Sequence, residues 1–345
     1  MQTESLHRYH ALNRRRVLLV AGMLAVALLA VVADLMTGPA GLPLAETLGA
    51  LTGWGEVARS AEVIVWQVRL PVAIMALLVG AALALAGAEM QTVLENPLAE
   101  PFTLGVSASA ALGSATAIVL GLGLPGLPPV WSVSANAFLF ALGALALLQL
   151  MGRLRGGGPE VLILCGIALN FTAGAFLSLL QFVASADALQ QLVFWTMGSL
   201  AAASWPGVTV LAVVLAVTAP FSLKAAWQLT ALRLGEEQAR SFGVDVARLR
   251  RWSLLRVSLL AASAVSMVGV IGFVGLAGPH IARMLLGEDH RFFLPGSLLT
   301  GAVVMSLASL VSKTVVPGVL LPVGLVTSLI GLPIFFSLIL RGRGR

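Results

Sequence analysis

The sequence predicts an all-α, polytopic membrane protein with about ten transmembrane helices. Of its 345 residues, 59% are hydrophobic and only 10% are charged, whereas soluble domains carry about 25% charged residues. Apolar runs with almost no charge recur along the chain, and most approach the roughly 20 residues that a helix needs to cross a bilayer. Because every backbone polar group in lipid needs a partner within the protein, these runs are expected to be helices.

The predicted spans follow one another through short connections. Nine apolar runs lie at residues 17–33, 70–88, 104–124, 130–150, 161–184, 208–223, 257–277, 298–310 and 320–340. A tenth, short span is expected between a turn at Gly272 and Gly275 and the charged segment 283–291. Pro97 and Pro101 turn the chain back after the second span, because proline breaks a helix.

The placement of lysine and arginine predicts that both termini lie in the cytoplasm. With ten spans, 18 of the 21 lysines and arginines fall on the inner side, and only Arg59, Arg69 and Lys313 fall outside. Cytoplasmic loops typically carry such an excess. The first span is expected to remain as a helix, although a basic segment before an apolar run is also typical of a signal peptide.

The domain organisation follows from this topology. Residues 1–16 form a cytoplasmic tail, residues 17–340 form a single transmembrane domain, and residues 341–345 form a second cytoplasmic tail. The longest connection has about 28 residues, and a segment shorter than about 40 residues rarely folds alone. Soluble machinery must therefore come from partner chains.

Motifs of enzymes and nucleotide-binding proteins are missing or misplaced. The pattern G-x-G-x-x-G at residues 121–126 follows a predicted span, whereas a dinucleotide site needs it between a strand and a helix. Neither lysine lies in the Gly-Lys-Ser/Thr sequence of a P-loop. We therefore expect no enzymatic activity, catalytic residue, metal site or cofactor in this chain. Ionisable residues within spans are few, with Glu89 and Arg69 as candidates, which disfavours a proton-coupled carrier.

The longest inner connection, residues 224–251, has a pattern of short helices. Gly235 precedes Glu236 and Glu237, whose charges are favourable in the first turn of a helix. Gly243 can adopt the left-handed conformation that ends a helix, and Asp245 is a good N-cap for the next one. The sequence predicts two short helices joined at Gly243, with an ordinary solvated basic loop as the alternative.

Several segments together resemble the permease subunits of binding-protein-dependent ABC importers for iron–siderophore complexes, haem and vitamin B12. The matching segments begin with the second and third spans, residues 68–113, which include NPLAEPF, and continue with LGEEQARSFGV at 234–244. They end with IGFVGLAGPHIARMLLGEDHRFFLPGS at 271–297 and LPVGLVTSLIGLPIFFSLIL at 321–340. The resemblance covers most of residues 60–340 in the expected order.

The resemblance implies the partners and the location of the protein. It implies ten helices per subunit and a second permease subunit, in a homodimer or a close heterodimer. It also implies two ATP-binding subunits that hold ATP and Mg, and a periplasmic or surface-anchored substrate-binding protein. It places the chain in the bacterial inner membrane, with no nucleic-acid partner. An iron chelate is the expected cargo, with a ferric siderophore favoured and haem or vitamin B12 as alternatives. A proton-coupled secondary transporter is the alternative of a different class.

The resemblance also implies three sets of site residues. The ATPase-coupling set is Leu234, Gly235, Glu236, Glu237, Ala239, Arg240, Ser241, Phe242, Gly243 and Val244. The cytoplasmic gate consists of Asn96, Pro97 and Leu98 with Gly157 and Gly158, and a plain helix-reversing turn is the alternative. The cations expected to meet the substrate-binding protein are Arg59, Arg69 and Lys313, with snorkelling to the membrane surface as the alternative.

Overall fold

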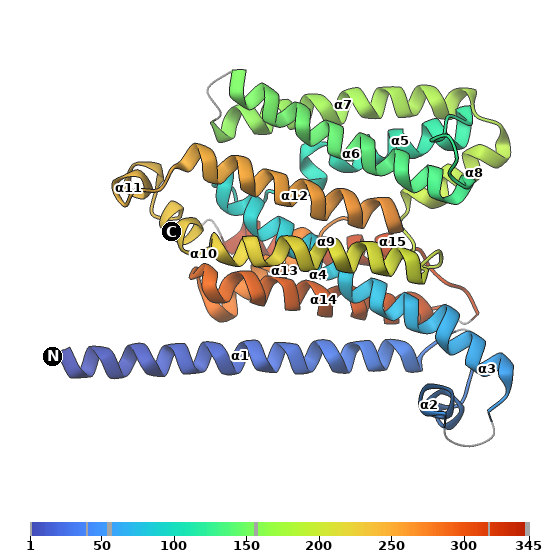
Figure 1. The fold of residues 1–345 in the computed structure, drawn as a ribbon, viewed down its shortest axis with the longest axis horizontal. Helices are drawn as coiled ribbons and strands as arrows, with labels where there is room; N and C mark the ends of the chain where they lie inside the picture. The colour runs from blue at the N-terminus through green and yellow to red at the C-terminus, as the bar shows by residue number, and fades with distance from the viewer. Residues whose placement is uncertain (1, 39–40, 54–56, 155–157, 317, 342–345) are drawn as a thin grey trace.

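The computed structural model describes residues 2–38, 41–53, 57–154, 158–316 and 318–341. Within these ranges the regular structure is helical, and the long helices lie side by side in one bundle (Figure 1). The first half of the chain contains α1 (Gln2–Met36), α2 (Leu44–Thr52), α3 (Arg59–Val63), η1 (Ile64–Arg69), α4 (Leu70–Val93), η2 (Pro101–Leu104), α5 (Val106–Leu120), α6 (Pro129–Leu154) and α7 (Pro159–Val183). The second half contains α8 (Ala186–Thr196), α9 (Trp205–Lys224), α10 (Ala226–Leu232), α11 (Glu236–Ser241), α12 (Val246–Val268), α13 (Val274–Leu286), α14 (His290–Thr314) and α15 (Val323–Arg341).

Seven helices in the described residues are long and apolar enough to cross a membrane. They are His10–Met36, Arg59–Val93, Trp131–Gly152, Pro159–Val183, Trp205–Lys224, Val246–Val268 and His290–Thr314. The shorter helices α5, α13 and α15 lie where the remaining predicted spans were expected. The prediction of an all-α, polytopic membrane protein is therefore confirmed.

The helix α4 forms the centre of the bundle. Nearly all of its residues are buried, and it packs against α12, α13 and α14. Gly80 of α4 faces Gly301 of α14 so closely that a Cβ on either residue would collide with the backbone of the other. Small residues allow this approach between membrane helices. The central position of α4 brings its C-terminal end and the turn that follows it against several other elements.

The seventh span differs from its predicted limits. The apolar run 257–277 was expected to form it, but α12 begins at Val246 and ends at Val268. Gly269 has φ +77° and Phe273 has φ +67°, so the chain turns sharply within the apolar run before α13 begins at Val274. A hydrophobic run does not reveal such a turn, because buried turns and buried helices share an apolar composition.

Candidate functional site

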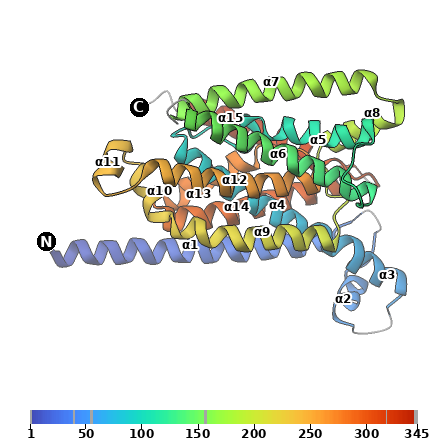
Figure 2. The ribbon, with the colours of Figure 1, turned by 45° about the horizontal axis from the view of Figure 1, so that its top comes forward.

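A compact protrusion at one end of the bundle contains the predicted coupling residues. It consists of α10, α11 and their connections, residues 225–245, and we refer to it as the elbow (Figures 1 and 2). Gly235 has φ +109° before α11, and Gly243 has φ +82° after it. The Asp245 side chain accepts a hydrogen bond from the backbone N–H of Arg248 at 2.9 Å, so Asp245 caps α12.

The local predictions for the elbow are confirmed in part. The short helix after Gly235, the left-handed Gly243 and the Asp245 cap are all present. The expectation of a second short helix after Gly243 is wrong, because Asp245 caps the long α12 directly. The second short helix is α10, which precedes Gly235.

Packing divides the elbow into an anchored side and an exposed side. Ala239 and Val244 are buried in the core of the protein, as is Leu229 of α10. By contrast, 60% of Leu234 and 56% of Phe242 remain exposed. Exposed apolar side chains on a fixed knob are a common feature of surfaces that bind another protein. The remaining charges are partly satisfied within the elbow, since Arg240 pairs with Glu236 at 3.0 Å.

Arg250 of α12 connects the elbow to the turn that follows α4. The guanidinium group is buried, and its Nε donates a hydrogen bond to the carbonyl oxygen of Val93 at 3.1 Å. The same group lies 3.8 Å from Glu236 of α11 and 4.0 Å from Glu95. Glu95 itself has a positive φ of 51°. One side chain therefore touches both the elbow and the predicted gate turn.

The predicted gate residues Asn96, Pro97 and Leu98 form a tight turn directly after Glu95. The side-chain oxygen of Asn96 accepts a hydrogen bond from the backbone N–H of Leu98 at 2.9 Å, so this amide stabilises the turn itself. Leu98, in contrast, is exposed and lines a pocket of about 500 Å³. The other walls of this pocket come from the segment after Glu100, from residues around Phe273 and from α15.

Of the two glycines predicted for the companion gate loop, the structure describes only Gly158. Gly158 is the N-cap of α7, and a Cβ at this position would meet open space. Gly157 lies outside the described residues. Of the predicted gate residues, Asn96 stabilises the turn through its side chain, and Leu98 has an exposed side chain.

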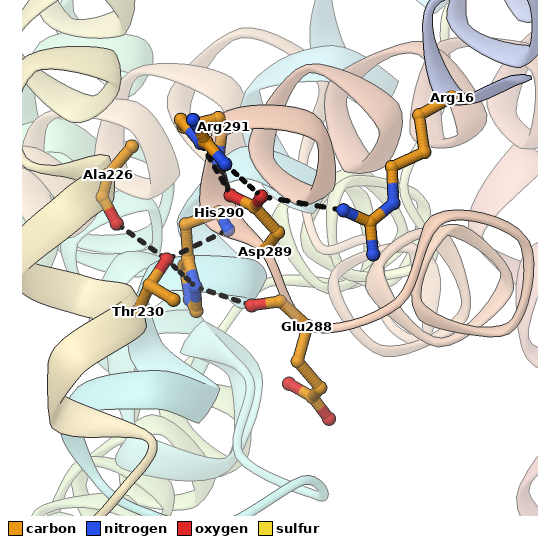
Figure 3. A network of polar contacts seen from close by, with 7 residues as sticks. All are labelled: Arg16, Ala226, Thr230, Glu288, Asp289, His290 and Arg291. Carbon is orange, nitrogen blue, oxygen red and sulfur yellow. Dashed lines mark hydrogen bonds and ion pairs between the residues drawn. The ribbon is translucent and has the colours of Figure 1, made fainter. Parts of the chain in front are cut away.

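A histidine-centred network forms a second connection between the elbow and the bundle (Figure 3). His290, the first residue of α14, has its Nε2 at 2.8 Å from the hydroxyl of Thr92 in α4. Its Nδ1 lies 3.3 Å from the hydroxyl of Thr230 in α10, and its backbone N–H donates to the same hydroxyl at 3.0 Å. His290 therefore links α10 to the central helix.

Charged residues extend this network around the turn between α13 and α14. Glu288 pairs with Arg233 at 2.9 Å and with Arg283 at 3.1 Å. Arg283 also donates a hydrogen bond to the side chain of Gln91 at 2.9 Å. On the far side of the turn, Asp289 faces Arg16 of α1 at 3.5 Å (Figure 3). Sequence reasoning missed this cluster, because its members come from five separate segments and share no motif.

The intramembrane candidate Glu89 is neutralised by an arginine. Its carboxylate is fully buried and accepts a hydrogen bond from Nε of Arg256 in α12 at 2.9 Å. Arg256 also donates to the hydroxyl of Ser253 at 2.9 Å. Because removing one partner of such a pair leaves an uncompensated buried charge, the pair fixes α12 against α4.

Two of the three predicted outer cations lie inside the protein. Lys313 is only 9% exposed and pairs with the buried Asp34 at 2.9 Å. Arg69 is also buried, and it donates to the carbonyl oxygen of Leu35 at 3.3 Å. The expectation that both present free charges at the outer surface is wrong, because each has partners near the end of α1. Arg59, at the start of α3, is exposed as expected.

Comparison with known proteins identifies the family. The model of the FecCD transport family matches residues 24–341, which is nearly the whole chain. The chain belongs to the FecCD transport family. It is therefore a permease, the membrane transport subunit of an ABC transporter, in a family that works with ATPase and substrate-binding partners.

The similarity to known permeases extends over most of each chain and supports this assignment. The chain is 39% identical to the hemin transport system permease protein HmuU of Yersinia pestis, over 87% of this chain and 90% of the relative. It is 34% identical to the vitamin B12 import system permease protein BtuC of Klebsiella pneumoniae, over 97% of each chain. A solved structure of a metal-chelate type ABC transporter in an inward-facing conformation has a TM-score of 0.82 and 31% identity, and covers 94% of this chain and 99% of its own.

Proposed function

We propose that this permease forms the translocation pathway of a bacterial inner-membrane importer for an iron chelate, with a ferric siderophore as the favoured cargo. ATP and Mg bind to a separate ATPase subunit. The observation that carries this proposal is the elbow, a knob with exposed Leu234 and Phe242 whose buried side is tied to the gate turn through Arg250.

The contacts of Arg250 and His290 support a route from the ATPase to the pathway. An ATPase that moves α11 displaces the Glu236 carboxylate, which lies beside Arg250. Arg250 is bonded to the carbonyl of Val93 immediately before the gate turn. Displacement of α10 reaches α4 separately, through Thr230, His290 and Thr92. Both routes end at the inner end of the central helix.

The assembly that we propose contains two copies of this chain, two ATPase subunits and a substrate-binding protein on the outer side. One face of α7 supports the first part, because Leu164, Phe171 and Phe182 lie on the same side of the helix and are all exposed. A second permease subunit would cover this face and enclose a pathway with α7 and α15. On the outer side, Arg59 is the remaining cation of the predicted set for steering the binding protein, a role that complementary charges commonly have.

The proposed cargo is based on the names of the relatives. The relative in Yersinia pestis is named for hemin, that in Klebsiella pneumoniae for vitamin B12, and the solved structure for a metal chelate. These cargoes are all large, rigid metal complexes. Haem and vitamin B12 are therefore the alternatives against which a ferric siderophore must be tested.

Reconstitution in liposomes tests the proposal. The permease is incorporated with its ATPase, and the substrate-binding protein is loaded in turn with a ferric siderophore, haemin or cobalamin. We expect ATP-dependent uptake of the siderophore that stops when the ATPase is inactivated. ATP-dependent uptake of only haemin or only cobalamin would show that the proposed cargo is wrong, while the proposed ATP-driven mechanism would stand. Uptake that follows a proton gradient without ATP would contradict the mechanism.

A further inference from the structure

A polar pocket lies where the elbow meets the adjoining ends of α9 and α12, and Gln228, Gly243 and Asp245 of the elbow form part of its lining. It has a volume of about 490 Å³ and sits at the end of the bundle that carries the elbow. The two helices lie side by side in both views (Figures 1 and 2). The lining residues that matter here are Phe221, Lys224, Gln228, Asp245, Arg248 and Trp252.

The pocket holds two cations that have no carboxylate partner. Lys224 lies over the ring of Phe221, 5.5 Å from its centroid, and within the described residues it has no ion pair. The guanidinium group of Arg248 likewise has no hydrogen bond or ion pair with the described part of the chain. By contrast, the nearby Arg233, Arg240 and Arg256 all pair with glutamates. The pocket therefore has an unmatched positive charge.

The carboxylate in the pocket cancels only part of this charge. Asp245 lies in the lining, but its Oδ1 accepts the backbone N–H of Arg248 at 2.9 Å and caps the helix. Arg256 also reaches the lining, and its charge is matched by Glu89. Apart from the Arg256–Glu89 pair, the charged groups of the lining are Lys224, Arg248 and the carboxylate of Asp245, so the positive charges outnumber the negative one. The start of the 23-residue α12 adds the positive end of a helix dipole.

Neutral donors complete the polar lining. The indole N–H of Trp252 and the side-chain amide of Gln228 find no acceptor among the residues that the structure describes. Both side chains are exposed. Lysine, arginine, indole and amide groups are all hydrogen-bond donors, so the pocket is built to receive an anion with several oxygen atoms.

An apolar track leads from this pocket along α9. Val213, Val217 and Phe221 are spaced four residues apart, so they lie on one face of the helix. About half of each side chain is exposed, at 56%, 56% and 55%. Lys224 follows on the same face, and the exposed Trp252 stands beside it across the groove. A basic pocket at the end of an apolar helix face matches a molecule with an anionic head and a hydrocarbon tail.

We propose that this pocket binds the phosphate headgroup of an anionic phospholipid, whose acyl chains lie along the exposed face of α9. Basic pockets between membrane helices on the cytoplasmic side bind such headgroups, and tryptophan is enriched at this level of the membrane. An acidic surface of the ATPase would meet Lys224 and Arg248 alone, whereas a phospholipid would meet these two cations and the apolar face of α9 together. The proposal depends on the chain being a membrane protein and is independent of its cargo.

Lipid binding to the purified, full-length permease tests the proposal. The probes are phosphatidylglycerol, phosphatidylcholine and inorganic phosphate, and the measurements are native mass spectrometry and the thermal midpoint in detergent. We expect phosphatidylglycerol to be retained and to raise the midpoint more than phosphatidylcholine does. Because basic side chains attract anionic headgroups, Lys224→Gln with Arg248→Gln should weaken phosphatidylglycerol binding by roughly tenfold or more.

Matched variants distinguish lipid binding at this pocket from a general effect of removing positive charge from the protein. Arg59→Gln removes an exposed cation of α3, at the end of the bundle opposite the elbow (Figure 1), and should leave phosphatidylglycerol binding unchanged. Arg248→Lys keeps the positive charge and, in a protein that still has Lys224, should keep most of the binding. Equal binding of phosphatidylcholine, an equal effect of inorganic phosphate alone, or an equal loss in the Arg59 control would overturn the proposal. Retained lipid binding in the Lys224 and Arg248 double variant, with loss of the ATPase instead, would assign the pocket to the partner protein.

Discussion

At the scale of single residues, the permease depends on buried polar side chains that each join two elements. Arg250 touches the elbow and the gate turn, His290 links α10 to α4, and Arg256 fixes α12 to Glu89. Such groups cost free energy unless they are paired. At one end of the bundle these side chains tie the elbow, the gate turn and α12 to the central helix.

The contacts of Arg250 predict that a substitution there uncouples transport from ATP hydrolysis while the complex still assembles. Replacing Arg250 with Gln removes the charge that faces Glu236 and Glu95 but keeps a hydrogen-bond donor for Val93. We expect ATP-dependent uptake to fall roughly tenfold, which corresponds to about 1.4 kcal/mol, while ATP hydrolysis by the assembled complex continues. The control is Arg251→Gln, at an exposed neighbouring position, which should transport normally. Parallel losses of hydrolysis and transport in the Arg250 variant would contradict the link.

Glu100 predicts a pH-dependent stability. Its carboxyl group is buried beside the gate turn, and this burial raises its pKa from the ordinary value of 4.5 to about 7. Because the folded protein then holds a proton that the unfolded chain releases, the contribution of Glu100 to stability is largest below about pH 4.5 and declines as the pH rises to about 7. Glu100→Gln should therefore flatten the thermal midpoint between pH 5 and pH 8. An unchanged pH profile would contradict the assignment.

At the scale of elements, the elbow is where sequence and structure agree most closely. Gly235, Gly243 and Asp245 could be predicted because each has a local backbone role, and the structure confirms all three. The role of α10 could not be predicted in this way. Its position depends on the contact of Thr230 with His290, which lies 60 residues away.

The left-handed Gly243 predicts that a β-branched residue there uncouples the complex. Gly243 has φ +82°, and a side chain in this conformation costs roughly 1–2 kcal/mol. No atom lies within 4 Å of a Cβ at this position, so Gly243→Val strains the backbone without a collision. We expect ATP hydrolysis to continue while uptake is lost. Gly22→Val, at a glycine inside the regular helix α1 with open space around its Cβ, is the control. Normal uptake by Gly243→Val would weigh against the elbow as the coupling element.

At the scale of the whole molecule, composition predicted the helical fold, but it did not predict which polar side chains are buried. The apolar runs predicted the helices because bilayer thickness limits their length. They could not place the end of α12, since Gly269 and Phe273 turn within an apolar segment. Nor could they show that Lys313 and Arg69 are buried, because the partners Asp34 and Leu35 lie far away in the chain.

We propose the elbow as the contact through which an ATPase drives this permease. Copurification of the ATPase with the full-length permease in mild detergent tests this contact, using Leu234→Ser with Phe242→Ser against Leu24→Ser with Leu28→Ser, a pair of exposed apolar residues on α1. We expect the wild-type permease and the α1 variant to retain the ATPase, while the elbow variant loses it. Retention of the ATPase by the elbow variant, or its absence from the wild-type preparation, would contradict the proposed contact.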